Sequence, residues 1–229
     1  MSSTKFNKSL AQIRVAIDVV VFTIEQDKLK TLLVKRVQEP FPNRLALPGG
    51  FIWESERSID TAKRILRDKT GVEGVFIEQL FTFDEVDRDP RGRVLSITYY
   101  ALVSADKLTQ SNISLAKQAI LQDVDSIKDL AFDHDKIVNY ALERLRTKIL
   151  YTNTIYSILP ETFTFAQLQH VYELILSQKL DKRNFRKKYL SLGLIEPTGE
   201  SLVGQKHRPA ALYRFVSSSP TELNAPFIR

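Results

Sequence analysis

The segment from residue 47 to residue 72 brings glycines, carboxylates and an arginine together at fixed spacing. Gly49 and Gly50 follow a proline, and glycine lets the backbone approach a ligand closely or adopt positive φ. Glu56 and Arg64 come next, on either side of the start of an expected helix. A carboxylate here is a candidate ligand for a hard cation, which prefers anionic oxygen. The alternative is that Glu56 and Arg64 form a purely structural pair that supports the loop.

This segment reads LPGGFIWESERSIDTAKRILRDKTGV and resembles the Nudix box, G-x5-E-x7-R-E-U-x-E-E-x-G-U, where U is aliphatic. Six residues fall on register, namely Gly50, Glu56, Arg64, Leu66, Gly71 and Val72. The resemblance implies that box glutamates hold Mg²⁺ on the diphosphate of a nucleotide substrate. The three acidic positions of R-E-U-x-E-E are instead Ile65, Asp68 and Lys69.

These departures predict a Nudix fold without hydrolase activity. Positions 65, 68 and 69 share one helix face, because residues three and four apart are neighbours. Ile65 is then a hydrocarbon on the former metal face, Lys69 is a cation that repels a metal, and Asp68 is left as a lone carboxylate. We therefore assign no catalytic residue and no metal site. Ile59, Ala62 and Leu66 are the predicted buried stripe of this helix.

Arginines near the box are candidates for binding an anionic ligand. Arg88 and Arg91 lie in a charged segment, residues 87–93, which we expect to be an exposed loop between two strands. Arginine binds diphosphate oxygens bidentately. Arg36, at the end of an expected strand, is a weaker candidate. The alternative is a solvated hairpin tip and solvated strand ends.

A second basic cluster lies in a predicted helix that starts after Asp181. The spacing places its cations on one arc and Phe185, Tyr189 and Leu192 on the other side. Leu190 falls within the basic arc, and we expect the helix end to turn inward there. A basic face of this kind suits the major groove of DNA, although a merely solvated face is the alternative. The candidate DNA contacts are Lys182, Arg183, Asn184, Arg186 and Lys187 on the helix, with Lys206, His207 and Arg208 on a following wing.

The elements around these sites fall into two groups. Strands are predicted at 15–24, 29–36, 75–84 and 94–103, with the box helix at 58–69 and an amphipathic helix at 133–150. Thr164 and Gln167 then form a predicted capping box for a helix that extends to about residue 177. The basic helix follows, and strands at 194–197, 202–207 and 211–216 complete a hairpin. Helix, turn, helix and hairpin is the plan of a winged helix.

Composition narrows the class of protein. The chain has 229 residues and no cysteine, which excludes disulfides and thiolate metal sites and suits a cytoplasmic protein. Neither a signal peptide nor an apolar run long enough to span a membrane is recognisable. The net charge is +6, and residues 151–229 hold ten Lys or Arg against six Asp or Glu. This modest basic excess agrees with a polyanionic partner.

A disabled Nudix box joined to a winged helix resembles the Nudix-related transcriptional regulators, which are bacterial repressors of NAD biosynthesis genes. The resemblance extends over nearly the whole chain, including LAFDHDKIVNYALERLR and TFTFAQLQHVYELIL. It implies an α+β fold: a Nudix α/β/α sandwich with a mixed sheet at residues 1–150 and a winged helix at 151–229. It further implies ADP-ribose as effector, no cofactor, and a homodimer on a palindromic operator. The implied effector pocket is Gly49, Gly50, Glu56, Arg64, Arg88 and Arg91, with Arg36 added.

Two alternatives remain open at this point. A related branch of regulators on the same scaffold responds to sugars such as arabinose, and neutral ligands would leave the loop arginines without a role. The other alternative is a weak hydrolase of ADP-ribose or nucleoside diphosphates that uses Asp68, Glu56 and a carboxylate from elsewhere. Lys69 argues against the hydrolase.

Overall fold

The computed structural model describes residues 12–110, 119–202, 209–223 and 226–227. Its larger part is a seven-stranded sheet in the order β3-β2-β1-β6-β5, with β4 paired to β1 and β7 paired to β2. Among the described strands, β1 and β6 are the one parallel pair, so the sheet is mixed as predicted. The strands are β1 (Arg14–Glu25), β2 (Lys28–Lys35), β3 (Leu45–Ala46), β4 (Gly49–Phe51), β5 (Ile77–Phe83), β6 (Val94–Leu102) and β7 (Ala119–Asp123).

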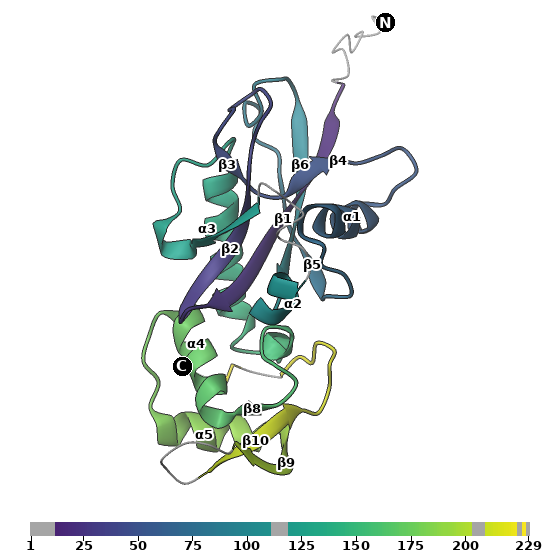
Figure 1. Ribbon diagram of the computed structural model, residues 1–229. Coiled ribbons are helices and arrows are strands. Elements are labelled where there is room, and N and C mark those ends of the chain that lie inside the picture. Colours follow the sequence, from purple (N-terminus) through teal and green to yellow (C-terminus); the bar gives the residue numbers. More distant parts are fainter. Residues whose placement is uncertain (1–11, 111–118, 203–208, 224–225, 228–229) are drawn as a thin grey trace, which may run out of the picture.

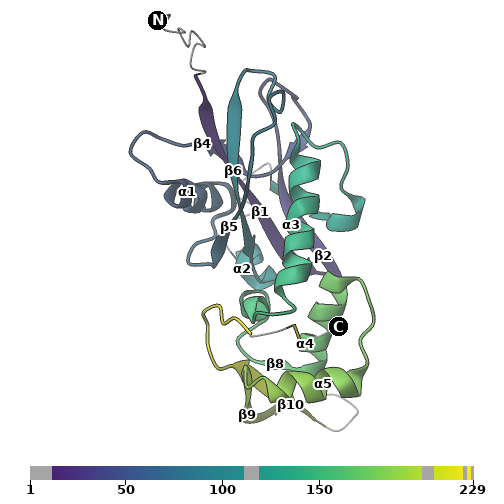
Figure 2. The same cartoon turned by 180° about the vertical axis from the view of Figure 1, so that it is seen from behind.

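Helices cover both faces of this sheet (Figures 1 and 2). Side chains alternate across a strand, so Ile17, Val19 and Val21 of β1 pack with α1 (Ser58–Thr70), whereas Val20 and Phe22 pack with α3. Helix α3 spans His134–Lys148, the short α2 spans Ala105–Gln110, and a 3₁₀ turn spans Val124–Ser126. The predicted α/β/α sandwich is confirmed. Among the described residues, no helix is long and apolar enough to cross a membrane.

Helix α1 differs from the prediction in the face that it buries. Ile65 is 2% exposed and packs in the core with Ala62 and Leu66, so the expectation that it lies on the former metal face is wrong. Ile59 is only partly buried, which means that the apolar stripe lies further along the helix than predicted. Gly71 ends the helix with φ of 71°, as the sequence predicted.

The C-terminal part is a winged helix. A 3₁₀ turn (Thr154–Ser157) leads to β8 (Phe163–Thr164), α4 (Phe165–Leu176) and α5 (Lys182–Ser191). The predicted capping box is present, because Thr164 accepts from the Gln167 N–H and the Gln167 side chain accepts from the Thr164 N–H. Strands β9 (Ile195–Leu202) and β10 (Ala210–Phe215) form the antiparallel wing.

The wing corrects two further expectations. The strand predicted at 194–197 continues to Leu202 as the single strand β9, in spite of Pro197 and Gly199, whereas residues 203–207 of the strand predicted at 202–207 lie outside the described residues. β9 lies at the edge of the order β8-β10-β9, where a proline is tolerated because it need not donate to a neighbour. Leu190 is 40% exposed, since α5 continues to Ser191 and keeps this side chain on the outer face.

One apolar cluster continues from the α3 side of the sheet into the winged helix. Leu142 and Leu145 of α3 belong to the same cluster as Leu168, Tyr172 and Ile175 of α4. Tyr172 in turn contacts Phe185 of α5, with ring centroids 5.2 Å apart. The two parts therefore share a core, which fixes α4 against the lower end of the sheet (Figure 1).

Candidate effector pocket and nucleic-acid interface

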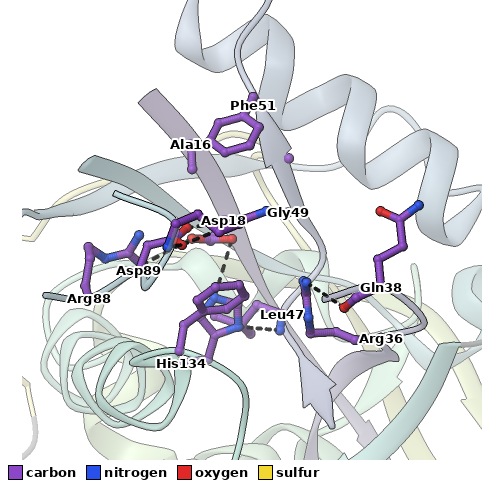
Figure 3. Close-up of a pocket in the computed structure, with 13 residues that line it drawn as sticks. Ala16, Asp18, Arg36, Gln38, Leu47, Gly49, Phe51, Arg88, Asp89 and His134 are labelled. Atoms are coloured by element: carbon purple, nitrogen blue, oxygen red, sulfur yellow. Dashed lines mark hydrogen bonds and ion pairs between the residues drawn. The ribbon is translucent and has the colours of Figure 1, made fainter. Parts of the chain in front are cut away.

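A cavity of about 290 Å³ opens where β1 and β4 meet the loops that precede α3 and β6 (Figure 3). This volume is just below the usual range for small-molecule sites, ~300–1,000 Å³. Its walls combine charged, aromatic and backbone groups from segments that are far apart in sequence. The lining residues are Ala16, Asp18, Arg36, Gln38, Leu47, Gly49, Gly50, Phe51, Arg88, Asp89, Arg91, Phe132 and His134.

Asp18 is the buried carboxylate of this cavity. It interrupts the apolar strand β1, is 6% exposed, and accepts a 2.6 Å hydrogen bond from the Ser96 hydroxyl. Gly49 pairs with Asp18 in the β1–β4 register, and a Cβ at Gly49 would run into the Asp18 carboxylate. The glycine at position 49 is therefore required by close approach.

His134 lies at the start of α3 and is 4% exposed. Its Nδ1 accepts from the Leu47 N–H at 2.9 Å, so the neutral ring carries its proton on Nε2, which faces the Asp18 carboxylate at 3.7 Å (Figure 3). Burial lowers the pKa of His134, with Asp18 opposing that shift. The neutral imidazole thus ties α3 to the strand segment that precedes Gly49.

Arg88 lines the cavity, but the expectation of an exposed loop is wrong at this residue. Its side chain is 3% exposed and donates to both carboxylate oxygens of Asp133, at 2.6 and 3.0 Å. Asp18 lies 3.7 Å away on the other side. A guanidinium that is buried must be paired, so Arg88 is first of all a structural residue that holds the start of α3.

Arg36 and Arg91 are the more accessible cations of the cavity. Arg91 is paired with the buried Asp89 at 2.7 Å, and this hydrogen bond raises the pKa of Arg91. Arg36 donates only to the carbonyls of Pro40 and Gln38, and no described carboxylate lies within ion-pair distance of it. Burial, followed by repulsion from Arg91, lowers the pKa of Arg36. Of the three arginines that line the cavity, Arg36 is thus the one without a carboxylate partner at ion-pair distance among the described residues.

Two phenylalanines that the sequence analysis missed stand beside these cations. The Arg91 guanidinium lies 5.4 Å from the ring centroids of both Phe51 and Phe132, and the Arg36 guanidinium lies 4.8 Å from that of Phe132. Aromatic faces next to guanidinium groups suit a ligand that carries both a flat ring and a negative charge.

Glu56 and Arg64 do not line this cavity. Arg64 donates to both carboxylate oxygens of Glu56, at 2.6 and 2.8 Å, and its guanidinium stacks 3.7 Å from the Trp53 ring centroid. The hydrogen bond from Arg64 lowers the pKa of Glu56 to about 2. The geometry is that of the structural pair considered above, so their expected place among the pocket residues is not supported.

The former metal positions of the box are unsuited to Mg²⁺. Ile65 is buried in the core, Asp68 pairs with Arg67 at 3.2 Å, and Lys69 is exposed. Glu56 is occupied by Arg64. Over the described ranges, no group of three or more His, Asp or Glu side chains is placed to hold a metal ion.

Helix α5 lies at the end of the molecule away from the cavity (Figure 2), and its Lys182, Arg183 and Lys187 side chains are all exposed, as the predicted basic face requires. Asn184 is the third residue of the helix, and its backbone N–H donates to the capping side chain of Asp181. Arg186 is different, because it donates to the Tyr213 hydroxyl at 2.7 Å and stacks 4.8 Å from the Phe165 ring centroid. It links α5 to the wing strand β10. The expected wing contacts Lys206, His207 and Arg208 lie outside the described residues.

Comparisons with known proteins agree with this architecture. A NUDIX domain model matches residues 13–141, and a model of the NrtR DNA-binding winged helix domain matches residues 155–215. The chain is 36% identical over 203 residues to the ADPR responsive transcriptional repressor NtrR of Acinetobacter baylyi. The aligned region covers 87% of this chain and 80% of that protein.

Solved structures give the same result. The crystal structure of Shewanella oneidensis NrtR complexed with a 27mer DNA matches with a TM-score of 0.81 and 35% identity, over 88% of this chain and 93% of that one. The NUDIX domain of the same protein complexed with ADP ribose matches with a TM-score of 0.54 and 36% identity, over 61% of this chain and 92% of that one. The chain therefore belongs to the NrtR family, in which a Nudix domain is joined to a C-terminal winged helix.

Proposed function

We propose that this protein is a transcriptional repressor that binds ADP-ribose in the cavity of residues 1–150 and operator DNA through residues 151–229. The observation that carries the proposal is a cavity with an uncompensated cation, Arg36, beside Arg91 and two aromatic rings. The diphosphate of ADP-ribose matches the two arginines, and its adenine ring matches the two aromatic rings. The resemblance to the Nudix-related transcriptional regulators makes the genes of NAD biosynthesis the proposed targets, and we place the protein in the cytoplasm.

The charge of the cavity favours an anionic effector over a sugar. Arg88 and Arg91 each have a carboxylate partner, whereas Arg36 has only carbonyl acceptors among the described residues. A charge-assisted hydrogen bond to a phosphate oxygen contributes about 1.5–3 kcal/mol. A neutral pentose would leave Arg36 without this compensation.

For DNA, the exposed basic face of α5 is the proposed major-groove surface. Arg183 is the proposed base-reading residue, because guanidinium pairs bidentately with guanine. Lys182 and Lys187 are proposed phosphate contacts, and the exposed Asn184 side chain is a second proposed base contact, to adenine. Arg186, a candidate DNA contact by sequence, is instead proposed to position α5 against the wing, since Tyr213 and Phe165 hold its guanidinium. A homodimer on a palindromic operator follows from the resemblance.

We further propose that the protein is not a hydrolase. Lys69 and Ile65 replace acidic ligands, and Glu56 is held by Arg64. ADP-ribose incubated with Mg²⁺ should therefore release no AMP above background. Turnover at an ordinary enzymatic rate, on the order of 1–10³ per second, would refute a purely regulatory role.

The proposal is tested by calorimetric titration with ADP-ribose, ribose and arabinose. Arg36→Ala should weaken ADP-ribose binding by about 10- to 150-fold, the equivalent of one lost charge-assisted contact. Arg57→Ala is the matched control, because Arg57 pairs with Asp60 on the exposed side of α1. Binding of pentoses but not of ADP-ribose would favour the sugar-responsive alternative.

A further inference from the structure

Helix α3 begins at the cavity. Asp133, which precedes its first turn, receives both hydrogen bonds from Arg88, and His134 accepts from the Leu47 N–H. Arg88, His134 and Leu47 all line the cavity. A ligand that fills this space therefore touches the residues that hold the start of α3.

The same helix ends at the winged helix. Arg146, in its last turn, donates through Nε to the carbonyl of Ile175 and through Nη2 to the hydroxyl of Ser177, both at 3.0 Å. These two residues form the end of α4, whose last carbonyls have no partner inside the helix. Arg146 thus binds the end of α4, where the chain turns toward α5.

The junction has one further polar contact and unfilled space. Nε2 of His170 on α4 lies 3.0 Å from the Asp27 carboxylate, in the turn between β1 and β2. A cavity of about 340 Å³ beside this contact is lined by Asp27, Arg146, Leu174 and Ser177 among others. The contact of α4 with the turn between β1 and β2 is thus incompletely filled at this edge, beside the shared apolar core.

We propose that α3 couples effector binding to the position of the winged helix. The Arg88–Asp133 pair responds to the ligand at the start of α3, and the Arg146 contacts move α4 at its end. The inference rests on the proposed function. A diphosphate in the cavity competes with Asp133 for Arg88, which loosens the start of α3. The helix is a rigid rod of about 1.5 Å per residue, so a tilt at its start displaces Arg146, and with it α4 and α5.

The test uses the full chain and compares the dissociation constant for operator DNA without and with saturating ADP-ribose. The ratio of the two constants measures the coupling, typically about 5- to 150-fold. Arg146→Gln should bring the ratio close to one while ADP-ribose affinity stays within about two-fold of the parent. Ser177→Gly removes one of the two contacts, the one to the Ser177 hydroxyl, and suits the positive φ of 53° at this position. It should lower the ratio, and it tests the inference if Arg146→Gln does not fold.

Glu143→Gln is the matched control. Glu143 accepts from the third guanidinium nitrogen of Arg146 on the exposed side of α3. Loss of the Glu143 charge leaves the hydrogen bonds from Arg146 to α4 intact. Its ratio should equal that of the parent. If the parent ratio is large and both Arg146→Gln and Ser177→Gly preserve it, the inference is overturned and the proposed function stands. If ADP-ribose does not change DNA affinity in the parent, both are refuted.

Discussion

Replacing Arg88 by alanine should destabilise the protein strongly, although this residue lies in a loop. The Arg88 and Asp133 side chains are 3% and 10% exposed and share two hydrogen bonds. Alanine would leave the Asp133 carboxylate buried without its partner. Breaking a buried pair in this way costs about 3–5 kcal/mol. In a chain of this length about 1 kcal/mol lowers the melting temperature by roughly 2–4 °C, so the expected loss is roughly 6–20 °C.

The assays are thermal unfolding for the melting temperature and urea unfolding for the free energy, both followed by circular dichroism, with Arg57→Ala as control. Arg57 makes the same two-bonded pair with Asp60, at 2.7 and 3.1 Å, but the two side chains are 80% and 42% exposed. An exposed pair contributes only about 0–1 kcal/mol. Adding Asp133→Asn to Arg88→Ala should restore part of the loss, because it removes the stranded charge. Equal effects of Arg88→Ala and Arg57→Ala would refute the assignment of Arg88 as a structural residue.

Three further predictions concern Gly49, Thr164 and His134. Gly49→Ala should lower the free energy of unfolding by about 1–3 kcal/mol and abolish ligand binding, because the new methyl meets the Asp18 carboxylate. Urea unfolding measures this loss, and Gly50→Ala, whose methyl would lie 3.7 Å from Ile65, is the control. Thr164→Ala should lose about 1 kcal/mol with the capping box, and Thr164→Ser should not; a loss in both would contradict the role of the hydroxyl. Burial lowers the pKa of His134 below 6.5, so its stabilising effect is complete above pH 6.5 and is lost as the pH falls through that value toward the folded-state pKa. Unfolding from about pH 7.5 to about pH 5.5 should show this loss, and His134→Asn, which keeps an acceptor for Leu47, should reduce the slope.

Local patterns predicted the elements well. The buried strands, the end of α1 at Gly71 and the capping box at Thr164 all depend on residues close together in sequence, and the structure confirms them. The sequence predicted that a strand ends at Pro197, but β9 continues through it. Proline has no N–H to donate, and at the edge of the sheet none is needed on the outer side.

The cavity was predicted only in part, because its polar contacts join distant segments. Arg88 pairs with Asp133 and His134 binds Leu47 across long stretches of chain, and no local pattern encodes either contact. One signal was available and went unused: Asp18 is a lone acid inside an apolar strand, and a buried charge of this kind needs a partner or a function.

The shared core has a consequence for how such regulators diversify. Modules joined by a flexible linker are interchangeable because each one folds around its own interior. Here Leu145 and Leu168 belong to one apolar cluster, so a foreign DNA reader would have to supply matching surface to α3. On the proposed role of α5, new operator preferences are then reached more readily by substitution at the exposed Arg183, the proposed base-reading residue, than by exchange of the whole module.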